Sequence, residues 1–116
     1  AVASCSSPAE IEAALDGCGV RDRFAAVASG HEVARSKPAP DVYLEATRLL
    51  GVDPRRCVAV EDSDTGIEAA RRAGLFVVAR RETRFGFSQE GAHRMVDRLD
   101  EVPAVVDGLS AGAAVR

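Results

Sequence analysis

The chain has 116 residues, a length typical of one domain with its own core. Its hydrophobic content of 47% and charged content of 28% are those of an ordinary globular protein, and a net charge of −3 gives no support for a nucleic-acid partner. No uncharged stretch approaches the roughly 20 residues that a membrane helix needs, so we expect no membrane partner. An odd number of cysteines without a Cys-x-x-Cys pair favours a cytoplasmic protein with unpaired, mostly buried thiols.

The first half of the chain predicts two strands and two helices. Residues 1–3 are apolar and resemble the end of a strand, and the capping box over residues 7–10 predicts a helix that ends near Gly17. Residues 24–28 form a second short apolar run, which predicts a strand. A proline followed by an aspartate at 40–41 predicts the start of a second helix with a buried stripe, formed by Val42, Tyr43, Ala46, Leu49 and Leu50.

The second half continues the same alternation. Residues 57–60 predict a buried strand, a polar turn follows, and a helix runs to Gly74 before another apolar strand at 75–79. A last strand or helix is expected near residues 95–106. We therefore expect an α/β core over residues 1–107, with a doubly wound (Rossmann-like) parallel sheet, and a disordered tail over residues 108–116.

Polar residues follow the predicted strands where ligands of such sheets bind, beyond the carboxyl ends of the strands. Ser4 follows the first strand, and Glu61 and Asp62 follow the third. Two neighbouring carboxylates repel each other, and a divalent cation would relieve that repulsion. Lys37, in the loop before the second helix, is the only lysine in the sequence, which favours a site that needs a compact point charge.

Each of these residues also has an ordinary structural explanation. Taken alone, Ser4 is more simply explained as a helix cap, Lys37 as a solvated side chain beside a turn, and Asp62 as the N-cap of the following helix. Three other motifs are excluded. Cys5 lacks the arginine of a tyrosine-phosphatase loop, the residues after Asp62 lack the glycine and glutamate of an EF-hand, and no G-x-G-x-x-G turn is present.

Taken together, the segments resemble one family. Ser4 at a strand end, SKPAPDVYLEA at 36–46 and CVAVEDSDTGIEAARRAG at 57–74 are similar to the second, third and fourth motifs of the haloacid-dehalogenase-like hydrolases. The similarity is greatest to the subgroup with phosphoglycolate phosphatases and β-phosphoglucomutase. In that family an aspartate attacks a phosphoryl group, and water later hydrolyses the aspartyl-phosphate.

The resemblance implies a role for each candidate residue in a phosphatase that depends on Mg²⁺. Ser4 and Lys37 would bind phosphoryl oxygens, and Lys37 would also pair with the nucleophile. Asp62 would bind Mg²⁺, with Glu61 as a second ligand or a support. Cys5 and Ser6, which lead into the first helix, would add backbone donors for the phosphate. The implied substrate is a small phosphorylated metabolite.

The chain departs from the family in one large respect. The first motif, Asp-x-Asp-x-Thr, holds the nucleophile and should precede Ser4, but nothing precedes it here. The DSDTG segment at 62–66 is a poor substitute because no lysine follows it. We therefore expect a core without its first strand and its cap domain, with the missing N-terminal segment as a partner in trans, and no activity from this chain alone.

Other interpretations remain open. Within the enzymes, a sugar-phosphate mutase of the β-phosphoglucomutase type is an alternative, and a 2-haloacid dehalogenase is a weaker one because its chemistry has no use for a carboxylate pair that binds metal. A non-catalytic remnant or a module that depends on a partner is an alternative of another class. An in-frame Asp-x-Asp-x-Thr in the upstream DNA would favour the enzyme, and a start codon at this point would favour the module.

Overall fold

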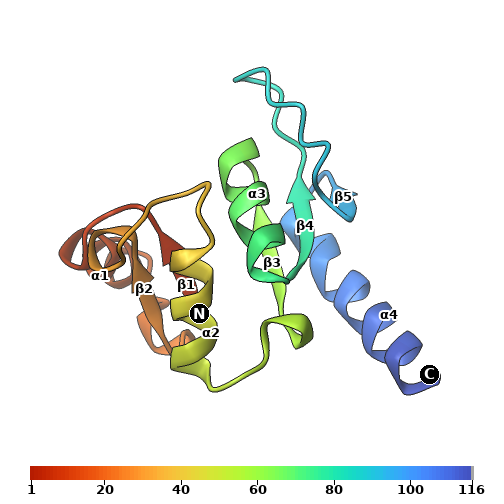
Figure 1. The fold of residues 1–116 in the computed structure, drawn as a ribbon, viewed down its shortest axis with the longest axis horizontal. Coiled ribbons are helices and arrows are strands. Elements are labelled where there is room, and N and C mark those ends of the chain that lie inside the picture. Colours follow the sequence, from red (N-terminus) through yellow and green to blue (C-terminus); the bar gives the residue numbers. More distant parts are fainter. Residues whose placement is uncertain (116) are drawn as a thin grey trace.

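The computed structural model describes residues 1–115, with side chains described up to residue 110. Strands and helices alternate along the described chain (Figure 1). The strands are β1 (Val2–Ser4), β2 (Val27–Ser29), β3 (Val58–Glu61), β4 (Phe76–Arg80) and β5 (Arg94–Val96). The helices are α1 (Pro8–Gly17), α2 (Asp41–Leu50), α3 (Asp64–Ala73) and α4 (Val102–Val115). The predicted α/β class is confirmed.

Local sequence signals explain where the helices begin and end. The capping box of α1 is present, since Ser7 Oγ accepts a hydrogen bond from the amide of Glu10 and the Glu10 carboxylate accepts one from the amide of Ser7. Gly51 and Gly74, with φ of 67° and 94°, end α2 and α3 in the left-handed conformation that glycine adopts most readily. The N-cap of α3 is Ser63, so Asp62 is not needed as a cap.

The strands form two separate parallel sheets. β1 pairs with β2, and β3 pairs with β4, which in turn pairs with β5. Helix α2 contacts β1, β2 and α3, so it connects the two sheets (Figure 1). Ala59, Val77 and Ala79 belong to the core with α2 and α3, whereas the alternate residues Val58 and Phe76 share a cavity with α4. Helices therefore cover both faces of the larger sheet.

An apolar groove of about 410 Å³ lies between β1 and β3, and we call it the slot. Its lining includes Val2, Ala3, Phe24, Val58, Val60 and Leu75. β1 and β3 do not pair with each other in the described sheets. Val60 of β3 is 43% exposed, which is unusual for a valine in an apolar strand of a doubly wound sheet.

The C-terminal helix and the cysteines bear on two sequence-based expectations. Helix α4 spans Val102–Val115 and includes most of the segment expected as a tail. Residue 116 of that tail lies outside the described residues. The cysteines are unpaired as expected, but Cys5 and Cys18 are exposed and Cys57 is half-buried, so the expectation of mostly buried thiols was wrong. Among residues 1–115, no helix has the length and apolar character required to cross a membrane.

Candidate active site

The carboxyl ends of β1 and β3 are joined by the ammonium group of Lys37. Its Nζ lies 2.7 Å from Oε1 of Glu61, the last residue of β3. The same Nζ lies 3.4 Å from the carbonyl oxygen of Ala3, which precedes Ser4 at the end of β1. Lys37 therefore lies across the carboxyl end of the slot. The structure brings Lys37 together with Glu61 and with the backbone beside Ser4, at the sheet edge where the sequence predicts a site.

The Glu61 carboxylate is held from three sides. The hydroxyl of Tyr43, in the first turn of α2, donates a hydrogen bond to Oε1, which also accepts a hydrogen bond from Lys37. On the side of α3, a Cβ added to Gly66 would overlap with Oε2, so the carboxylate occupies space that only a glycine leaves open. The Lys37 and Glu61 side chains are only 11% and 8% exposed. Removing one member of such a buried pair would leave an uncompensated charge.

Tyr43 remains a hydrogen-bond donor in this environment. Burial, followed by the negative charge of Glu61, raises the pKa of the Tyr43 hydroxyl above its ordinary value. Its ring lies 5.2 Å below the Lys37 ammonium, a distance that permits a cation–π contact. The sequence predicted Tyr43 only as part of a buried stripe. Because a buried tyrosine hydroxyl usually has a partner, that position was the available signal for this contact.

The loop after β1 contains the other predicted phosphate-binding residues. Ser4 Oγ accepts a hydrogen bond from the Ser6 amide at 3.1 Å, and the Ser6 carbonyl accepts one from the buried Ser29 hydroxyl at 2.6 Å. Gly30 lies against the backbone of Cys5, where a Cβ would be 3.1 Å from the Cys5 Cα. Ser29 and Gly30 therefore fix the path of the loop from Ser4 to Ser6 from the neighbouring strand.

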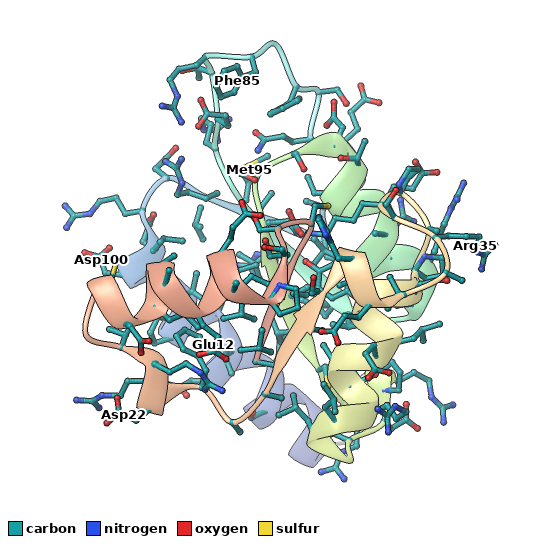
Figure 2. All side chains as sticks on the ribbon, turned by 90° about the vertical axis from the view of Figure 1, so that its left-hand side faces the viewer. Glu12, Asp22, Arg35, Phe85, Met95 and Asp100 are labelled. Carbon is teal, nitrogen blue, oxygen red and sulfur yellow. The ribbon has the colours of Figure 1, made fainter. Side chains whose placement is uncertain are left out.

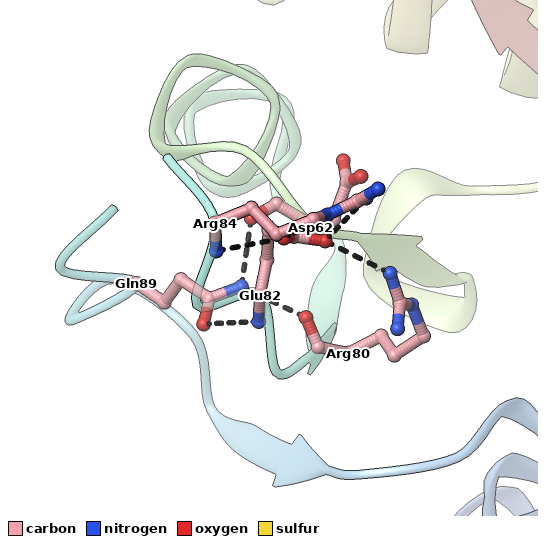
Figure 3. Close-up of polar contacts among 5 residues, drawn as sticks. All are labelled: Asp62, Arg80, Glu82, Arg84 and Gln89. Carbon is pink, nitrogen blue, oxygen red and sulfur yellow. Dashed lines mark hydrogen bonds and ion pairs between the residues drawn. The ribbon is translucent and has the colours of Figure 1, made fainter. Parts of the chain in front are cut away.

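Asp62 follows β3 and is exposed, and its backbone carbonyl accepts a hydrogen bond from a loop for which the sequence predicts no functional role. In this loop, over residues 81–93, the Gln89 side chain is buried and its Nε2 donates to the carbonyl oxygens of Asp62 and Arg80 at 2.7 and 2.8 Å (Figure 3). The backbone N–H of Gln89 donates a hydrogen bond to the Asp64 carboxylate at the start of α3. Gln89 thus joins the ends of β3 and β4 and the beginning of α3.

Glu82 stabilises the same loop through ion pairs with Arg80, at the end of β4, and with Arg84. Its carboxylate accepts from Arg80 at 3.0 Å and from Arg84 at 2.7 Å, and only 3% of its side chain is exposed. The hydrogen bonds from Arg84 lower the pKa of Glu82 to about 2. Phe85, which is 65% exposed, lies at the tip of the loop (Figure 2). This pattern of one glutamate between arginines has no periodic signature, so it could not be predicted from the sequence.

The donor set of this edge is compatible with a hard divalent cation. Asp62 offers an exposed carboxylate, the type of ligand that Mg²⁺ prefers. Glu61 has one oxygen already committed to Tyr43 and Lys37. Among the side chains of residues 1–110, no group of three or more His, Cys, Asp or Glu residues is arranged to hold a metal. Mg²⁺ commonly keeps several water ligands and needs only one or two carboxylates from the protein.

The parallel α/β layers and the lysine–carboxylate pair at the sheet edge define part of a Rossmann-like core with a polar site at the carboxyl ends of its strands. A family model described as haloacid dehalogenase-like hydrolase matches residues 1–74. The chain belongs to this family.

Named relatives agree with this assignment. The plasmid-encoded protein CbbY of Cupriavidus necator is 42% identical over 121 aligned residues, covering 100% of this chain and 47% of the relative. The fructose-1-phosphate phosphatase YqaB of Escherichia coli is 45% identical over 78 residues, covering 67% of this chain and 42% of the relative. The crystal structure of CbbY from Rhodobacter sphaeroides in complex with phosphate has a TM-score of 0.82 at 37% identity, covering 91% of this chain and 50% of that one. The chain thus spans about half the length of these relatives, or less.

Proposed function

We propose that the chain is part of the catalytic core of a phosphatase that depends on Mg²⁺ and hydrolyses a small phosphorylated metabolite through an aspartyl-phosphate. The observation that carries the proposal is the position of Lys37 at the carboxyl end of the slot, between the ends of β1 and β3. Phosphoryl transfer depends mainly on positioning and on stabilising negative charge on the phosphoryl oxygens. A fixed, partly buried ammonium group meets that requirement.

The slot is the proposed position of the strand that carries the nucleophile. Its lining is apolar, and the strands on either side, β1 and β3, each pair with a neighbour on one side only within the described sheets. A parallel strand inserted there would satisfy backbone groups on both sides and would cover Val60. A carboxylate at the carboxyl end of this strand would lie beside Lys37. We propose that an N-terminal segment, in cis or in trans, supplies this strand.

The other residues have roles that follow from their positions. The hydroxyl of Ser4 would donate a hydrogen bond to a phosphoryl oxygen, and the backbone amides of Cys5 and Ser6 in the same loop would offer further hydrogen bonds. Lys37 would hold a second phosphoryl oxygen and keep the nucleophilic carboxylate ionised by its positive charge. Asp62 would bind Mg²⁺ together with ligands from the inserted strand, while Glu61 supports Lys37. When bound, Mg²⁺ would neutralise charge on the phosphoryl group.

Similar proteins support the substrate class. YqaB is named a fructose-1-phosphate phosphatase, and another Escherichia coli relative is named hexitol phosphatase B. A small phosphorylated metabolite, such as a sugar phosphate, is therefore the proposed substrate here. A cytoplasmic location is proposed as well, because three unpaired cysteines suit a reducing compartment.

The test compares the chain alone with the assembled protein, by which we mean this chain together with the segment that supplies the inserted strand. We expect the purified chain to release no phosphate from p-nitrophenyl phosphate, and the assembled protein to do so only with Mg²⁺ present. Lys37→Met and Asp62→Asn should each abolish this turnover. Activity of the chain alone that disappears in Asp62→Ala would contradict the proposed role of the inserted strand, and an inactive assembled protein would favour a non-catalytic module.

A mutase of the β-phosphoglucomutase type is the alternative within the enzymes, since a β-phosphoglucomutase of Bacillus subtilis is 42% identical over 57 residues. The two activities give different products. A phosphatase releases one inorganic phosphate for each substrate consumed, whereas a mutase converts a sugar phosphate into its isomer with little release. Parallel measurement of inorganic phosphate and isomeric product therefore separates them.

A further inference from the structure

The hydroxyl group of Tyr43 has no role in the chemistry described so far, yet it is one of the most constrained polar groups of the site. Tyr43 is 6% exposed, and its ring belongs to the core between α2, α3 and the strands. Only its hydroxyl reaches the polar edge, where it donates to Oε1 of Glu61. A phenylalanine would fill the same core volume, so packing alone does not explain the hydroxyl.

We propose that Tyr43 is a positioning residue for Lys37: its hydroxyl fixes the Glu61 carboxylate so that the ammonium group keeps one orientation at the end of the slot. This inference rests on the proposed phosphate-binding role of Lys37. Tyr43 touches neither the phosphate nor the metal in this scheme. It acts through Glu61, the shared acceptor of both donors.

The geometry explains why Glu61 alone would not be sufficient. A carboxylate on a flexible side chain can rotate, and with it the hydrogen bond to Lys37 changes direction. Here Tyr43 fixes Oε1 from α2, while the close approach of Gly66 leaves no room for Oε2 to move towards α3. The carboxylate is thereby restrained from two helices before Lys37 binds to it. Such supporting contacts decide how accurately a binding group is held.

The hydrogen bonds of Lys37 are consistent with a ligand-binding role. An ammonium group has three N–H donors. Within the described residues, Glu61 Oε1 accepts one and the Ala3 carbonyl accepts a second, at 2.7 and 3.4 Å. The third remains for an anionic oxygen at the end of the slot. Its direction is set by the other two, and therefore by the carboxylate that Tyr43 holds.

The experiment measures the affinity of the assembled protein for inorganic phosphate, by calorimetry with Mg²⁺ present, in Tyr43→Phe and in a matched control. The control is Thr47→Val, which removes another buried hydroxyl of α2 that donates within its own helix, to the Leu44 carbonyl. Each variant loses one hydrogen bond, and Tyr43→Phe should lose more stability than Thr47→Val because its partner is a charged carboxylate. We expect phosphate affinity to fall about tenfold in Tyr43→Phe and to stay within about twofold of wild type in Thr47→Val.

A double-mutant cycle with Glu61→Met, which removes the acceptor oxygen and keeps the length of the side chain, tests whether Tyr43 acts through Glu61. If it does, adding Tyr43→Phe to Glu61→Met weakens phosphate binding by less than twofold further. Equal phosphate affinities in Tyr43→Phe and Thr47→Val, or independent effects of Tyr43→Phe and Glu61→Met, would overturn the proposal. Lys37→Met distinguishes a failure of the proposed function from a failure of the role of Tyr43. If Lys37→Met leaves phosphate affinity unchanged, the proposed function is at fault; if it lowers affinity while Tyr43→Phe does not, only the role of Tyr43 fails.

Discussion

Replacing Gly66 with alanine tests the arrangement around Glu61 most directly. Gly66 lies in the first turn of α3, where alanine is intrinsically the better helix former by about 1 kcal/mol. On helix propensity alone the substitution would stabilise the protein. The structure predicts the opposite, because the new Cβ would lie closer than 3.0 Å to the Glu61 carboxylate, which faces it directly.

The size of the effect follows from the two ways to relieve that overlap. If the Glu61 carboxylate moves away, Lys37 loses its partner at a site where its side chain is 11% exposed, and breaking a buried pair costs about 3–5 kcal/mol. If the backbone of α3 moves instead, overpacking costs about 1–3 kcal/mol. After the gain in helix propensity, we expect a net loss of about 2 kcal/mol in the free energy of unfolding.

Denaturant unfolding of the assembled protein measures this loss, with Gly17→Ala as the matched control. Gly17 lies at the end of α1, and a Cβ there would meet nothing within 4 Å, so alanine should be neutral or slightly stabilising. In a Glu61→Ala background, Gly66→Ala should become stabilising as well, because the overlapping group is gone. If Gly66→Ala proves as stable as Gly17→Ala in the wild-type background, the Glu61 carboxylate does not lie where the structure places it.

Three further predictions concern the stability of the fold. The chain without the inserted strand should melt in a broad transition that depends on protein concentration, because the slot leaves strand edges and Val60 uncovered. Near-ultraviolet circular dichroism measures this transition, and a sharp, concentration-independent melt of a monomer would contradict the prediction. Glu82 has a pKa of about 2, below its ordinary 4.5. The contribution of the ionised Glu82 to stability should therefore be complete above about pH 4.5 and disappear as the pH falls towards 2. The free energy of unfolding of Glu82→Gln should lack this part of the pH dependence. Ser7→Ala should lower the free energy of unfolding by about 1 kcal/mol through loss of the capping box of α1. Ser36→Ala, at an exposed serine whose hydroxyl makes no hydrogen bond within the described residues, is the comparison, and no measurable change in Ser7→Ala would show that the cap is dispensable.

Much of the fold could be predicted from the sequence because its signals are local. The capping box at Ser7 and the glycines at 51 and 74 mark helix ends directly, and the apolar runs place the strands to within one to three residues. The position of Glu61 at the carboxyl end of its strand follows from the rule for parallel sheets, and the resemblance to the family indicated Lys37 for the same site; the ion pair between the two side chains was not predicted.

The remaining features depend on contacts between distant segments. Gln89 and Glu82 are polar residues in a loop without periodicity, and nothing in their neighbourhood shows that their side chains turn inward to bind the ends of β3 and β4. The contact of the Tyr43 hydroxyl could not be predicted for a different reason. The helical period identifies its ring as buried, but it does not identify the group that meets its oxygen from β3.

Lys37 carries the only side-chain amine in the sequence, and this makes the site accessible to spectroscopy. Selective ¹⁵N labelling of the lysine ammonium would place a single labelled side chain of this chain beside Glu61, at the end of the slot, and would keep its three N–H donors. Its NMR signal would respond to insertion of the strand, to phosphate and to a paramagnetic divalent ion as three separate events. A protein that obtained its other positive charges from lysine would give overlapping signals; the fourteen arginines of this chain remain silent in that experiment.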